Sequence, residues 1–491
     1  MLIAAFLSGY SNHRNDNYGG SLDNRMRFLL EVLETVSEQA GEGVIIGVRL
    51  SADEKVEGGL DLTQAQDIAK RLESTGKIHY INVISGTNLD RFQRWAHWPA
   101  TPAPHGLFVD LAKNIKEVVN LPVFTVGRIT EITHAEKIIS DGSADMVGMT
   151  RAHIADPNIV SKIQQGRSDD IRPCVGANVC ISKLLEGLPI RCIHNPEAGR
   201  VGELKPLVST HQPKKVTVIG GGPSGLEAAR VTALKGHSVE IFERQSILGG
   251  QLRQWATSPA MDELMKIIEW QENQLKKLGV KVYTNSEMNP DKVVALEPNS
   301  VVIATGSYPI SIYSRPWIPD LQGDASSNLR IVTPHEVLES KNDTVKNAII
   351  WDHVGGESGS QMALSCAELI AKKGAKVQIV TPNFSVGEDI HPTMRTPMYE
   401  RLFSYGMNFI PNNKVTKIHQ DNVITQNVFS GKESVMSDVD MLVTCLGNEA
   451  NDSIYHSLNS KLENVHIIGD SLAPRTVESA MADGAKIARK L

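Results

Sequence analysis

Apolar runs alternate with segments of helical periodicity across residues 21–152. Continuously apolar strands that alternate with helices predict a parallel sheet covered on both faces. The repeat length suits (β/α) barrel units, but we count only four strands, and a closed barrel needs eight. The predicted strands are residues 43–51, 78–86, 121–129 and 144–152. The predicted helices are residues 21–40, with Ser21 as the expected N-cap, 106–119 and 133–140.

Two successive strand, turn and helix units of the Rossmann kind follow in the second half of the chain. Residues 214–245 read as strand, glycine turn, helix and strand. Residues 345–382 repeat that order with a distorted turn, and residues 464–491 close the chain as strand, turn and helix. The polar segment 202–215 contains two prolines and is the expected linker.

Composition excludes several classes of protein. The formal net charge of -6 argues against a nucleic-acid partner, which would need a basic surface. No apolar run approaches the roughly 20 residues of a membrane span. The N-terminus lacks a basic region before its apolar residues, so we expect no secretory signal. Five cysteines in 491 residues do not look like a disulfide framework, and a cytoplasmic protein is expected.

The strongest chemical motif is a glycine-rich turn between a strand and a helix. Gly220, Gly222 and Gly225 fit G-x-G-x-x-G, with Ser224 inside the motif. The first glycine permits the tight turn, the second lets a pyrophosphate approach, and the third lets the helix pack on the strand. Glu243 ends the next strand, where an acid would bind ribose hydroxyls. The pattern predicts a dinucleotide site; a purely structural glycine turn is the alternative.

Two later segments resemble further signatures of the two-dinucleotide flavoprotein disulfide-reductase-like fold. They are Val301–Pro309 and Val465–Pro474. By this resemblance Asp470 approaches the flavin ribityl chain, and Gln251, in the turn Gly249–Leu252, belongs to the same FAD (or ADP) site. The second Rossmann unit carries a longer turn that either holds NAD(P)H or is a relic of the fold. Its residues are Gly355, Gly356, Glu357 and Gly359.

Residues 6–32 resemble the segment that follows the fourth barrel strand in the old yellow enzyme family. The pattern N-x-R-x-D-x-Y-G-G-S-x-x-N-R-x-R-F is met in full between Asn12 and Phe28. The resemblance implies that the four predicted strands are barrel strands five to eight. It also implies that Arg49 contacts the pyrimidine edge of FMN, where a fixed cation would stabilise negative charge on the reduced flavin.

The same resemblance assigns the loops after the last two strands to the FMN phosphate. These loops carry Gly127 and Arg128, and then Gly148 and Arg151. Backbone amides and an arginine fork suit a phosphate dianion. Without the family match, Arg49 and Arg151 would read as members of ordinary salt bridges.

By this resemblance the first four barrel strands would lie before Met1, and the catalytic residues are expected there too. A fragment or mis-started reading frame would explain this, as would a second chain that supplies the first half of the barrel. A self-sufficient barrel of four units is the least favoured alternative, because it would leave two sheet edges unpaired.

Three of the five cysteines lie close together at Cys174, Cys180 and Cys192. A barrel, an iron–sulfur segment and two nucleotide-binding domains follow in this order in the trimethylamine dehydrogenase and 2,4-dienoyl-CoA reductase family, which the whole chain resembles. There four cysteines hold a [4Fe–4S] cluster. By this resemblance the three cysteines are the first, third and fourth ligands, and Ala177 stands at the second.

The motif around these cysteines looks most similar to demethylases of N-methylproline or dimethylglycine, and for that branch we expect the same alanine. Three thiolates can hold a [3Fe–4S] cluster, or a [4Fe–4S] cluster whose fourth iron takes water or a protein group. His194 is a candidate for that fourth ligand, and a zinc site is the alternative. Cys366 and Cys445 fall in a predicted Rossmann helix and strand and are expected to be inert buried thiols.

These assignments predict an α/β chain with four parts. They are the C-terminal half of a (β/α)8 FMN barrel (1–165), an iron–sulfur segment and linker (166–205), an FAD- or ADP-binding domain (206–310 with 440–491) and an inserted NAD(P)-binding-like domain (311–439). Trp95 and Trp98 lie in the loop after the sixth barrel strand. There they would either form an aromatic bowl for a methylated ammonium or simply pack the loop.

The leading hypothesis is a flavin- and iron–sulfur-dependent oxidoreductase that removes hydride from an N-methyl carbon; the iminium product then hydrolyses to formaldehyde and the demethylated amine. The alternative enzyme reduces an enoyl thioester, such as a 2,4-dienoyl-CoA, or another activated alkene with NAD(P)H. A third hypothesis is a non-catalytic fragment or electron-transfer subunit. Expected partners are a small-molecule substrate and an electron acceptor or NAD(P)H, and a homo-oligomer is left open.

Overall fold

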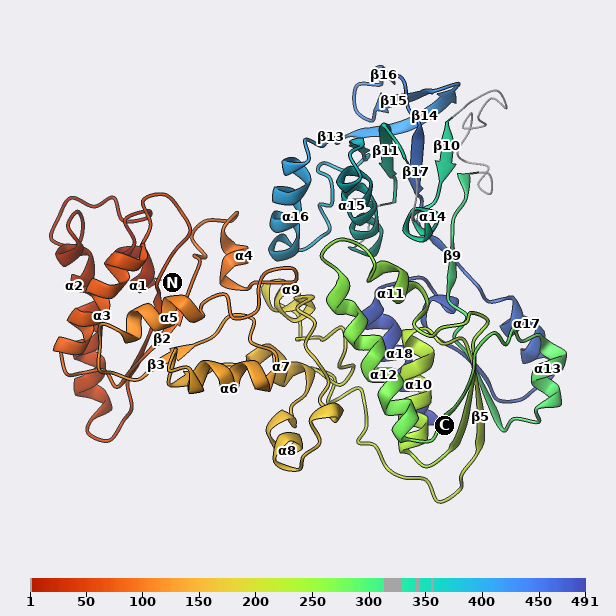
Figure 1. Cartoon of the computed structure of the whole chain (residues 1–491), viewed down its shortest axis with the longest axis horizontal. Helices are drawn as coiled ribbons and strands as arrows, with labels where there is room; N and C mark the ends of the chain where they lie inside the picture. Colours follow the sequence, from red (N-terminus) through yellow and green to blue (C-terminus); the bar gives the residue numbers. More distant parts are fainter. Residues whose placement is uncertain (1, 313–328, 341–343, 355–356) are drawn as a thin grey trace. The chain divides into compact units, whose positions relative to one another are not determined.

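The computed structural model describes residues 2–312, 329–340, 344–354 and 357–491, except the side chains of 357 and 358. Figure 1 traces the chain. It divides into two compact units. The first unit contains the residues up to Val160 together with 176–182 and 392–397. The second unit contains residues 161–175, 183–391 and 398–491.

The first unit is built on a four-stranded parallel sheet, as the sequence predicted. Its strands follow the chain in the order β1 (Gly47–Ser51), β2 (Tyr80–Ile84), β3 (Val123–Thr125) and β4 (Met146–Val147). The helices of this unit include α1 (Leu2–Leu7), α2 (Leu22–Ala40), α3 (Leu62–Ser74), α4 (Arg94–His97), α5 (Val109–Lys116), α6 (Ile132–Ser140) and α7 (Thr150–Ala155).

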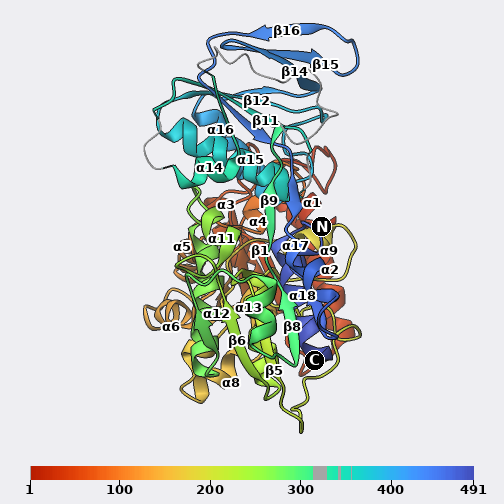
Figure 2. The same ribbon diagram turned by 90° about the vertical axis from the view of Figure 1, so that its right-hand side faces the viewer.

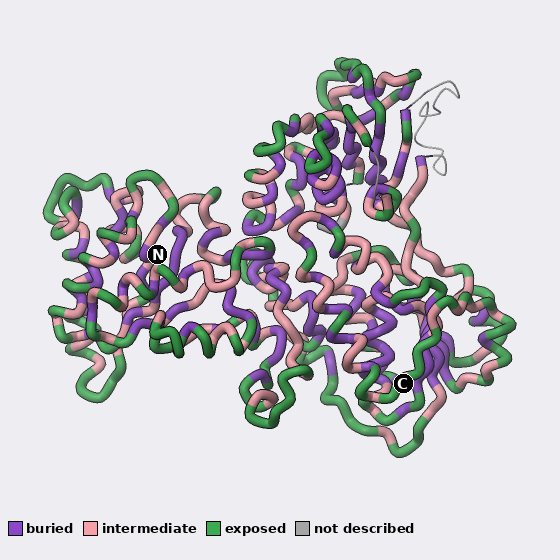
Figure 3. Tube along the Cα trace, viewed as in Figure 1, coloured by how far each residue is buried: buried purple, intermediate pink, exposed green. Residues whose placement is uncertain are grey.

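Helix α2 begins where the sequence placed it. The Ser21 hydroxyl accepts a hydrogen bond from the backbone N–H of Asn24, as an N-cap does. Its buried face carries Met26, Leu29 and Leu33, spaced three and four residues apart. These side chains join a core that includes Ile81 of β2 and the buried side of α3. Figure 3 shows the same alternation of buried and exposed positions along the trace.

The first strand is shorter than predicted, because it starts at Gly47 and not at Gly43. Gly43 has a φ of +90°, which is left-handed and incompatible with an extended strand. The N–H of Ile46 donates to the Nδ1 of His79 at 3.0 Å and so makes no strand bond. Ile45, which falls inside the predicted strand, is 73% exposed.

The second unit contains a five-stranded parallel sheet in the order β19-β8-β5-β6-β7. This central position of β5, with crossovers to both sides, is the doubly wound arrangement of dinucleotide-binding folds. Helix α10 (Pro223–Leu234) follows β5 directly and packs against α18 (Val477–Lys490) and α12 (Met265–Lys277). The strands are β5 (Lys215–Ile219), β6 (Ser238–Phe242), β7 (Lys281–Tyr283), β8 (Ser300–Ile303) and β19 (Val465–Ile467).

A second parallel sheet, in the order β10-β17-β11-β12-β13, is inserted in the chain between β8 and β19. Its strands are β10 (Arg330–Val332), β11 (Asn347–Asp352), β12 (Lys376–Val380), β13 (Asn408–Ile410) and β17 (Met441–Cys445). Helices α14 (Pro334–Glu339) and α15 (Glu357–Lys372) belong to it. The predicted placement of Cys366 in a helix and Cys445 in a strand is confirmed, and both thiols are buried.

A small antiparallel sheet packs on this inserted sheet, as Figure 2 shows. It consists of β14 (Asn413–His419), β15 (Asn422–Asn427) and β16 (Glu433–Met436). Val415, Ile418 and Val423 of the small sheet share one apolar core with Trp351 and Leu442. A two-stranded ribbon of β9 (Ser307–Pro309) and β18 (Asn448–Ala450) lies where the chain enters and leaves the insertion.

Short helices complete the described part of the chain. They are α8 (Ile159–Gln164), α9 (Val179–Leu185), α11 (Gly250–Trp255), α13 (Pro290–Ala295), α16 (Pro392–Ser404), α17 (Ser453–Asn459) and three 3-10 turns, Ser168–Asp170, Asp262–Leu264 and Gly469–Ser471. Among the described residues, none of the helices combines the length and the apolar character that crossing a bilayer requires.

Candidate functional site

The glycine turn after β5 is shaped by close backbone approaches. Gly220 has a φ of +105°, and a β-carbon there would lie 2.2 Å from the carbonyl oxygen of Ala304. A β-carbon on Gly225 would lie 2.1 Å from the carbonyl oxygen of Gly220. A β-carbon on Gly222 meets nothing within 4 Å. The first and third glycines are therefore required by packing, whereas the second leaves open space where the motif expects a pyrophosphate.

Helix α10 starts at this turn with Gly222 as its N-cap and Pro223 in its first position. Ser224 is buried, and a β-carbon on Gly469 would lie 2.5 Å from its hydroxyl oxygen. Gly484 of α18 likewise approaches the carbonyl of Ser224. These small residues hold the helix start tightly against the C-terminal segment. The helix N-terminus supplies unpaired N–H groups and a positive dipole end, which together suit a phosphate.

Glu243, directly after β6, is fixed at the edge of the glycine turn. One of its carboxylate oxygens accepts the N–H of Gly221 at 2.7 Å, and the other accepts the N–H of Gln245 at 2.8 Å. The side chain is 7% exposed. Each carboxylate oxygen keeps a further lone pair for ribose hydroxyls. The geometry therefore fits the role that the sequence predicts for this residue.

A chain of polar side chains connects Gln251 of α11 to Asp470. Gln251 donates to the hydroxyl oxygen of Ser307 at 3.0 Å, and Ser307 donates to Asp470 at 3.2 Å. Asn448 donates to Gln251 at 3.2 Å and to Ser307 at 3.1 Å. Burial raises the pKa of Asp470, although the N–H of Arg475 and the Ser307 hydroxyl oppose this rise. Ser307, inside the predicted signature Val301–Pro309, and Asn448, which no motif indicates, connect Gln251 to Asp470 through hydrogen bonds.

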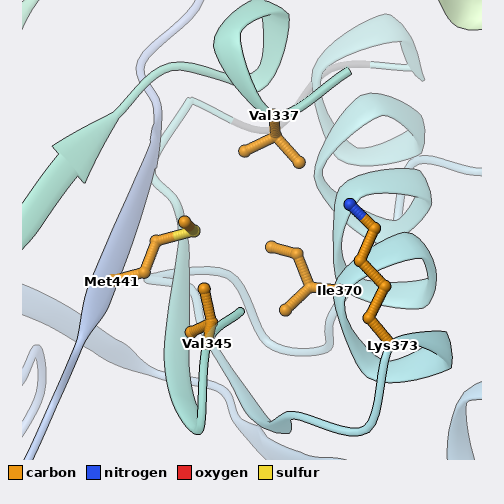
Figure 4. A pocket seen from close by; sticks show the side chains of 5 residues that line it. All are labelled: Val337, Val345, Ile370, Lys373 and Met441. Atoms are coloured by element: carbon orange, nitrogen blue, oxygen red, sulfur yellow. The ribbon is translucent and has the colours of Figure 1, made fainter. Parts of the chain in front are cut away.

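The distorted glycine turn of the inserted sheet falls largely outside the described residues. This applies to Gly355, Gly356 and the side chain of Glu357; Gly359 lies in α15. A small hollow elsewhere in this part is lined by Val337, Val345, Ile370, Lys373 and Met441 (Figure 4). It is about the size of one water molecule and is too small for a nucleotide.

In the first unit, Arg49 lies on β1 opposite Asn82 of β2 in the strand register. Desolvation lowers the pKa of Arg49. Burial lowers the pKa of the His97 imidazole in α4, and the positive charge of Arg49 lowers it further. The backbone of Ser85, directly after β2, acts in the opposite sense and raises the pKa of His97. This end of the strands is where barrel enzymes bind their substrates.

The predicted phosphate residues lie after β3 and β4. Gly127 has a φ of +105°, and a β-carbon there would lie 2.4 Å from the ring of Phe108. Gly148 follows β4, and its β-carbon would lie 2.6 Å from a methyl carbon of Val126. Close packing against Phe108 and Val126 accounts for both glycines without a ligand. Their roles at the FMN phosphate therefore stay predictions.

The two arginines beside these glycines bind backbone carbonyls within the first unit. Arg128 is 3% exposed and donates to the carbonyl of Ala103. Arg151 donates to the carbonyl of Pro99 at 2.8 Å and to the side-chain oxygen of Asn178. Both guanidinium groups therefore brace the loop that contains residues 99–103.

The two tryptophans of the predicted substrate loop flank His97. Trp95 lies in the short helix α4, where the sequence predicts a loop, and Trp98 follows the helix. The Trp98 ring stands edge-on to the His97 ring with 4.7 Å between centroids. The indole N–H of Trp95 is buried and finds no hydrogen-bond partner among the described residues.

Two of the three predicted cluster cysteines lie in the second unit. Burial and the neighbouring Cys174 raise the pKa of Cys192 to about 11. The backbone N–H groups of His194 and Asn195 donate to the Cys192 sulfur and oppose this rise. Such N–H groups also stabilise cluster-bound sulfur, so this environment fits an iron–sulfur ligand. Cys180 lies in the first unit, on α9.

A single-metal site is not supported by the described residues, which contain no group of three His, Cys, Asp or Glu side chains that could hold one ion. A zinc site at these cysteines would need such a group. Cys180 belongs to the other unit, so the cluster and the zinc site both stay predictions for these cysteines.

A cluster of buried charged side chains in the second unit includes Arg172, which lies two residues before Cys174. Glu227 of α10 is fully buried and pairs with Arg230 at 2.6 Å and with Arg172 at 4.0 Å. The guanidinium of Arg172 lies over the Trp270 ring at 4.5 Å. His194 is fully buried, stands edge-on to Trp270 at 4.9 Å and contacts the carbonyl of Pro173 through Nδ1. Its Nε2 is buried and finds no hydrogen-bond partner among the described residues, so the role of His194 as fourth ligand stays a prediction.

Two family profiles match this chain, one before and one after the cysteine segment. Residues 1–170 match the profile of the NADH:flavin oxidoreductase / NADH oxidase family. Residues 198–297 and 289–476 match the pyridine nucleotide-disulphide oxidoreductase profile. The segment between them carries the three clustered cysteines.

Curated relatives align along nearly the whole chain. A probable N-methylproline demethylase of Rhizobium meliloti is 35% identical over 93% of this chain and 66% of its own length. An NADH oxidase of Thermoanaerobacter brockii is 34% identical over 99% of this chain and 73% of its own length. The chain therefore spans only about two thirds to three quarters of these relatives.

Among solved structures, histamine dehydrogenase from Rhizobium sp. 4-9 superimposes with a TM-score of 0.90 at 27% identity. The match covers 100% of this chain and 72% of that one.

Proposed function

Since this chain belongs to the family that joins an NADH:flavin oxidoreductase part to a pyridine nucleotide-disulphide oxidoreductase part, we propose that it serves the oxidative N-demethylation of a small N-methylated amine or amino acid. The observation that carries the proposal is the order of three elements along one chain. A sheet with Arg49 near its C-terminal end comes first, the cysteine segment follows, and the Gly220 turn comes last.

The second unit would hold the dinucleotide, FAD or ADP, around the start of α10. Gly222 leaves space for the pyrophosphate, and the N-terminus of α10 provides donors for it. Glu243 would bind the ribose hydroxyls, since its two oxygens are already oriented by backbone N–H groups. Gln251 and Asp470 would contact the rest of the cofactor from their shared hydrogen-bond chain.

The first unit would hold FMN at the C-terminal ends of its strands. When bound, FMN supplies the acceptor for a hydride from the N-methyl carbon. Arg49 would lie beside the pyrimidine edge, where its charge favours an electron-rich ring. Gly127, Arg128, Gly148 and Arg151 would surround the phosphate. The two arginines would then serve both the loop that they already brace and the phosphate charge.

The cysteine segment would hold an iron–sulfur cluster on Cys174, Cys180 and Cys192. Support comes from the N–H groups aimed at the Cys192 sulfur and from the Coulombic interaction between Cys174 and Cys192. Ala177 provides no thiolate, so the cluster is either [3Fe–4S] or a [4Fe–4S] cluster with a non-cysteine group on one iron.

The direction of electron flow separates this proposal from its alternative. The NADH oxidase relative favours the alternative, an NAD(P)H-dependent reductase of an activated alkene such as a dienoyl-CoA. The demethylase relative and the structural similarity to histamine dehydrogenase favour amine oxidation. An electron-transfer subunit completed by another chain would keep the cofactors and lack turnover by itself.

Side-by-side assays test the proposal. Dimethylglycine, N-methylproline and a dienoyl-CoA with NADH are each supplied to the purified protein, and formaldehyde release and NADH oxidation are followed. The proposal expects formaldehyde from an N-methyl substrate. NADH consumption that depends on the dienoyl-CoA, without formaldehyde from either amine, would establish the alternative.

A further inference from the structure

Arg172 joins the start of the cysteine segment to its end. Its Nη1 donates to the side-chain oxygen of Asn195 at 2.8 Å, and the same oxygen accepts the backbone N–H of Glu197 at 3.1 Å. The backbone N–H of Asn195 in turn donates to the Cys192 sulfur. Since Arg172 lies two residues before Cys174, one guanidinium holds both cysteine-bearing ends of the segment within the second unit.

The same guanidinium belongs to a group of three buried charges, Arg172, Glu227 and Arg230, which we name the buried charge group. The carboxylate of Glu227 lies 2.6 Å from Arg230 and 4.0 Å from Arg172. Both guanidinium groups also lie over the Trp270 ring of α12, at 4.5 and 5.3 Å from its centroid. Arginine keeps its proton in proteins, so the group has more positive than negative charge.

This excess of positive charge acts on the cysteine segment. Burial and Cys174 raise the pKa of Cys192, and the charge of Arg172 is among the influences that oppose this rise. Glu197 also interacts with Arg172, but its side chain is 58% exposed and pairs with Arg489. Water screens an exposed carboxylate far more than a buried cation, so the positive charge of the buried group is not cancelled.

A buried cation beside the ligands of an iron–sulfur cluster favours the reduced cluster. Reduction adds one electron, and no bond to the protein forms or breaks. The reduction potential of such clusters depends on net charge, on hydrogen bonds to sulfur and on solvent exposure. The buried charge group contributes to the first of these directly. Through Asn195, it also positions one of the N–H donors of the second.

We propose that the buried charge group raises the reduction potential of the iron–sulfur cluster at this cysteine segment, with Arg172 as the positioning residue that carries the charge to it. The inference rests on the proposed function, because it presupposes the cluster. It deepens that function by assigning a direction to the electron: the excess positive charge favours transfer from reduced flavin to the cluster, as amine oxidation requires.

Charge variants separate this role from a purely structural one. Arg172→Met removes one positive charge, and Glu227→Gln removes the negative charge at nearly constant shape. The double variant Glu227→Gln with Arg230→Met removes one charge of each sign, and Arg172→Lys keeps the charge. The control is Arg401→Met, since Arg401 pairs at 2.8 Å with the buried Glu368 of the inserted domain.

The measurement is a potentiometric titration of the cofactor-loaded full chain, followed by electron paramagnetic resonance of the cluster, and it needs no turnover. Iron content per chain and thermal melts show whether each variant folds and keeps its cluster. We expect Arg172→Met to lower the equilibrium constant for cluster reduction about tenfold, which is about 59 mV for a one-electron couple.

The other variants fix the sign. Glu227→Gln should raise the same constant about threefold or more, because it leaves both guanidinium groups uncompensated. The double variant, Arg172→Lys and Arg401→Met should each stay within about threefold of wild type. If Arg172→Met loses its iron, the two Glu227 variants decide, because both leave the contact between Arg172 and Asn195 intact.

Two different results would overturn the inference. If the variants keep their iron but removal of a positive and of a negative charge leaves the potential unchanged, or shifts it in the same direction, the buried charge group only holds the segment in place. If wild-type protein reconstituted with iron and sulfide under anaerobic conditions holds no cluster, that part of the proposed function fails, and the inference fails with it.

Discussion

The carboxylate of Glu243 accepts the backbone N–H of Gly221 at 2.7 Å and so ties the end of β6 to the glycine turn after β5. The same carboxylate accepts the N–H of Gln245 through its other oxygen. The carboxylate proposed to bind ribose is therefore oriented by backbone N–H groups of the protein itself. Preorganisation of this kind reduces the ordering cost of binding.

Glu243→Gln is expected to lower dinucleotide affinity by about tenfold or more. The amide keeps one oxygen, but its NH2 group places a donor opposite the N–H of Gly221 or of Gln245 and removes the charge that favours ribose hydroxyls. The measurement is the FAD or ADP content per chain after purification, followed by titration of the stripped protein. Glu240→Gln on the same strand, away from the turn, is the control. Equal content in both variants would contradict the assignment.

Alanine substitutions should separate the three glycines of the turn by their effects. Gly220→Ala and Gly225→Ala place a β-carbon about 2 Å from a backbone oxygen, so each should destabilise the second unit by more than about 3 kcal/mol or prevent folding. Gly222→Ala meets no protein atom within 4 Å and should fold normally, yet it should lose dinucleotide. Thermal melts and cofactor content measure both. Full cofactor content in the Gly222 variant would show that no phosphate approaches this residue.

Motif reading was most successful where local geometry is demanding. The Gly220 turn, the Ser21 N-cap and the four parallel strands follow from residues that few other structures accept. It was less accurate at β1, where Ile45 lies outside the strand although its apolar character suits one. That boundary depends on a hydrogen bond from Ile46 to the distant His79 ring, which spacing along the chain does not reveal.

Asp170 should stabilise the second unit in a pH-dependent way. Its carboxylate accepts Lys277 at 2.8 Å and Gln274 at 3.0 Å, both on α12, and the bond to Lys277 is the main reason that its pKa lies well below the usual range. A lowered pKa means that this stabilisation is complete above the ordinary value near 3.8 and is lost as the pH falls through the lowered value.

Asp170→Asn should therefore reduce the free energy of unfolding by about 1 kcal/mol between pH 5 and 8, and the difference from wild type should shrink below about pH 4. Urea denaturation across this pH range measures it. Asp169→Asn is the control, because Asn273 bonds the backbone carbonyl of Asp169. A difference between Asp170→Asn and wild type that grows on acidification would contradict the account.

Iron content tests the three clustered cysteines. Serine at Cys174, Cys180 or Cys192 should remove most of the iron and the visible absorption of the cluster, because thiolates are the ligands of such clusters. Cys366→Ser, at a thiol buried in the inserted domain, should leave both unchanged. Retention of iron in all three serine variants would exclude the proposed ligand set.

Ala177→Cys should supply the missing thiolate. If the wild-type cluster is [3Fe–4S], the oxidised protein gives an electron paramagnetic resonance signal, and the variant should convert it to an oxidised [4Fe–4S] cluster without that signal. If the wild type already holds four irons, the iron content should stay constant and the spectrum of the reduced cluster should shift. An unchanged spectrum in both redox states would place residue 177 away from the cluster.

In the predicted substrate loop, some residues with unpaired polar atoms could not be identified from the sequence. Trp95 and Trp98 were predicted from their residue type, their loop and a family resemblance. His97 and Arg94 stand out only in the structure, through ring and guanidinium atoms that are buried and unpaired within the described residues. The buried Glu227 and Arg230 pair in α10 was missed for a similar reason, because its partners Arg172 and Trp270 are distant in sequence. The sequence around Glu227 and Arg230 therefore does not indicate that these two charged residues are buried and paired.

The central claim, that an N-methyl carbon is oxidised at a flavin bound to this chain, is tested most directly by a single turnover. Purified protein with its flavin oxidised is mixed anaerobically with dimethylglycine or N-methylproline, while flavin absorbance is recorded and formaldehyde is quantified. The account predicts bleaching of the flavin together with about one formaldehyde per flavin reduced. Flavin that stays oxidised with both amines, but is bleached by NADH and reoxidised by a dienoyl-CoA, would contradict it.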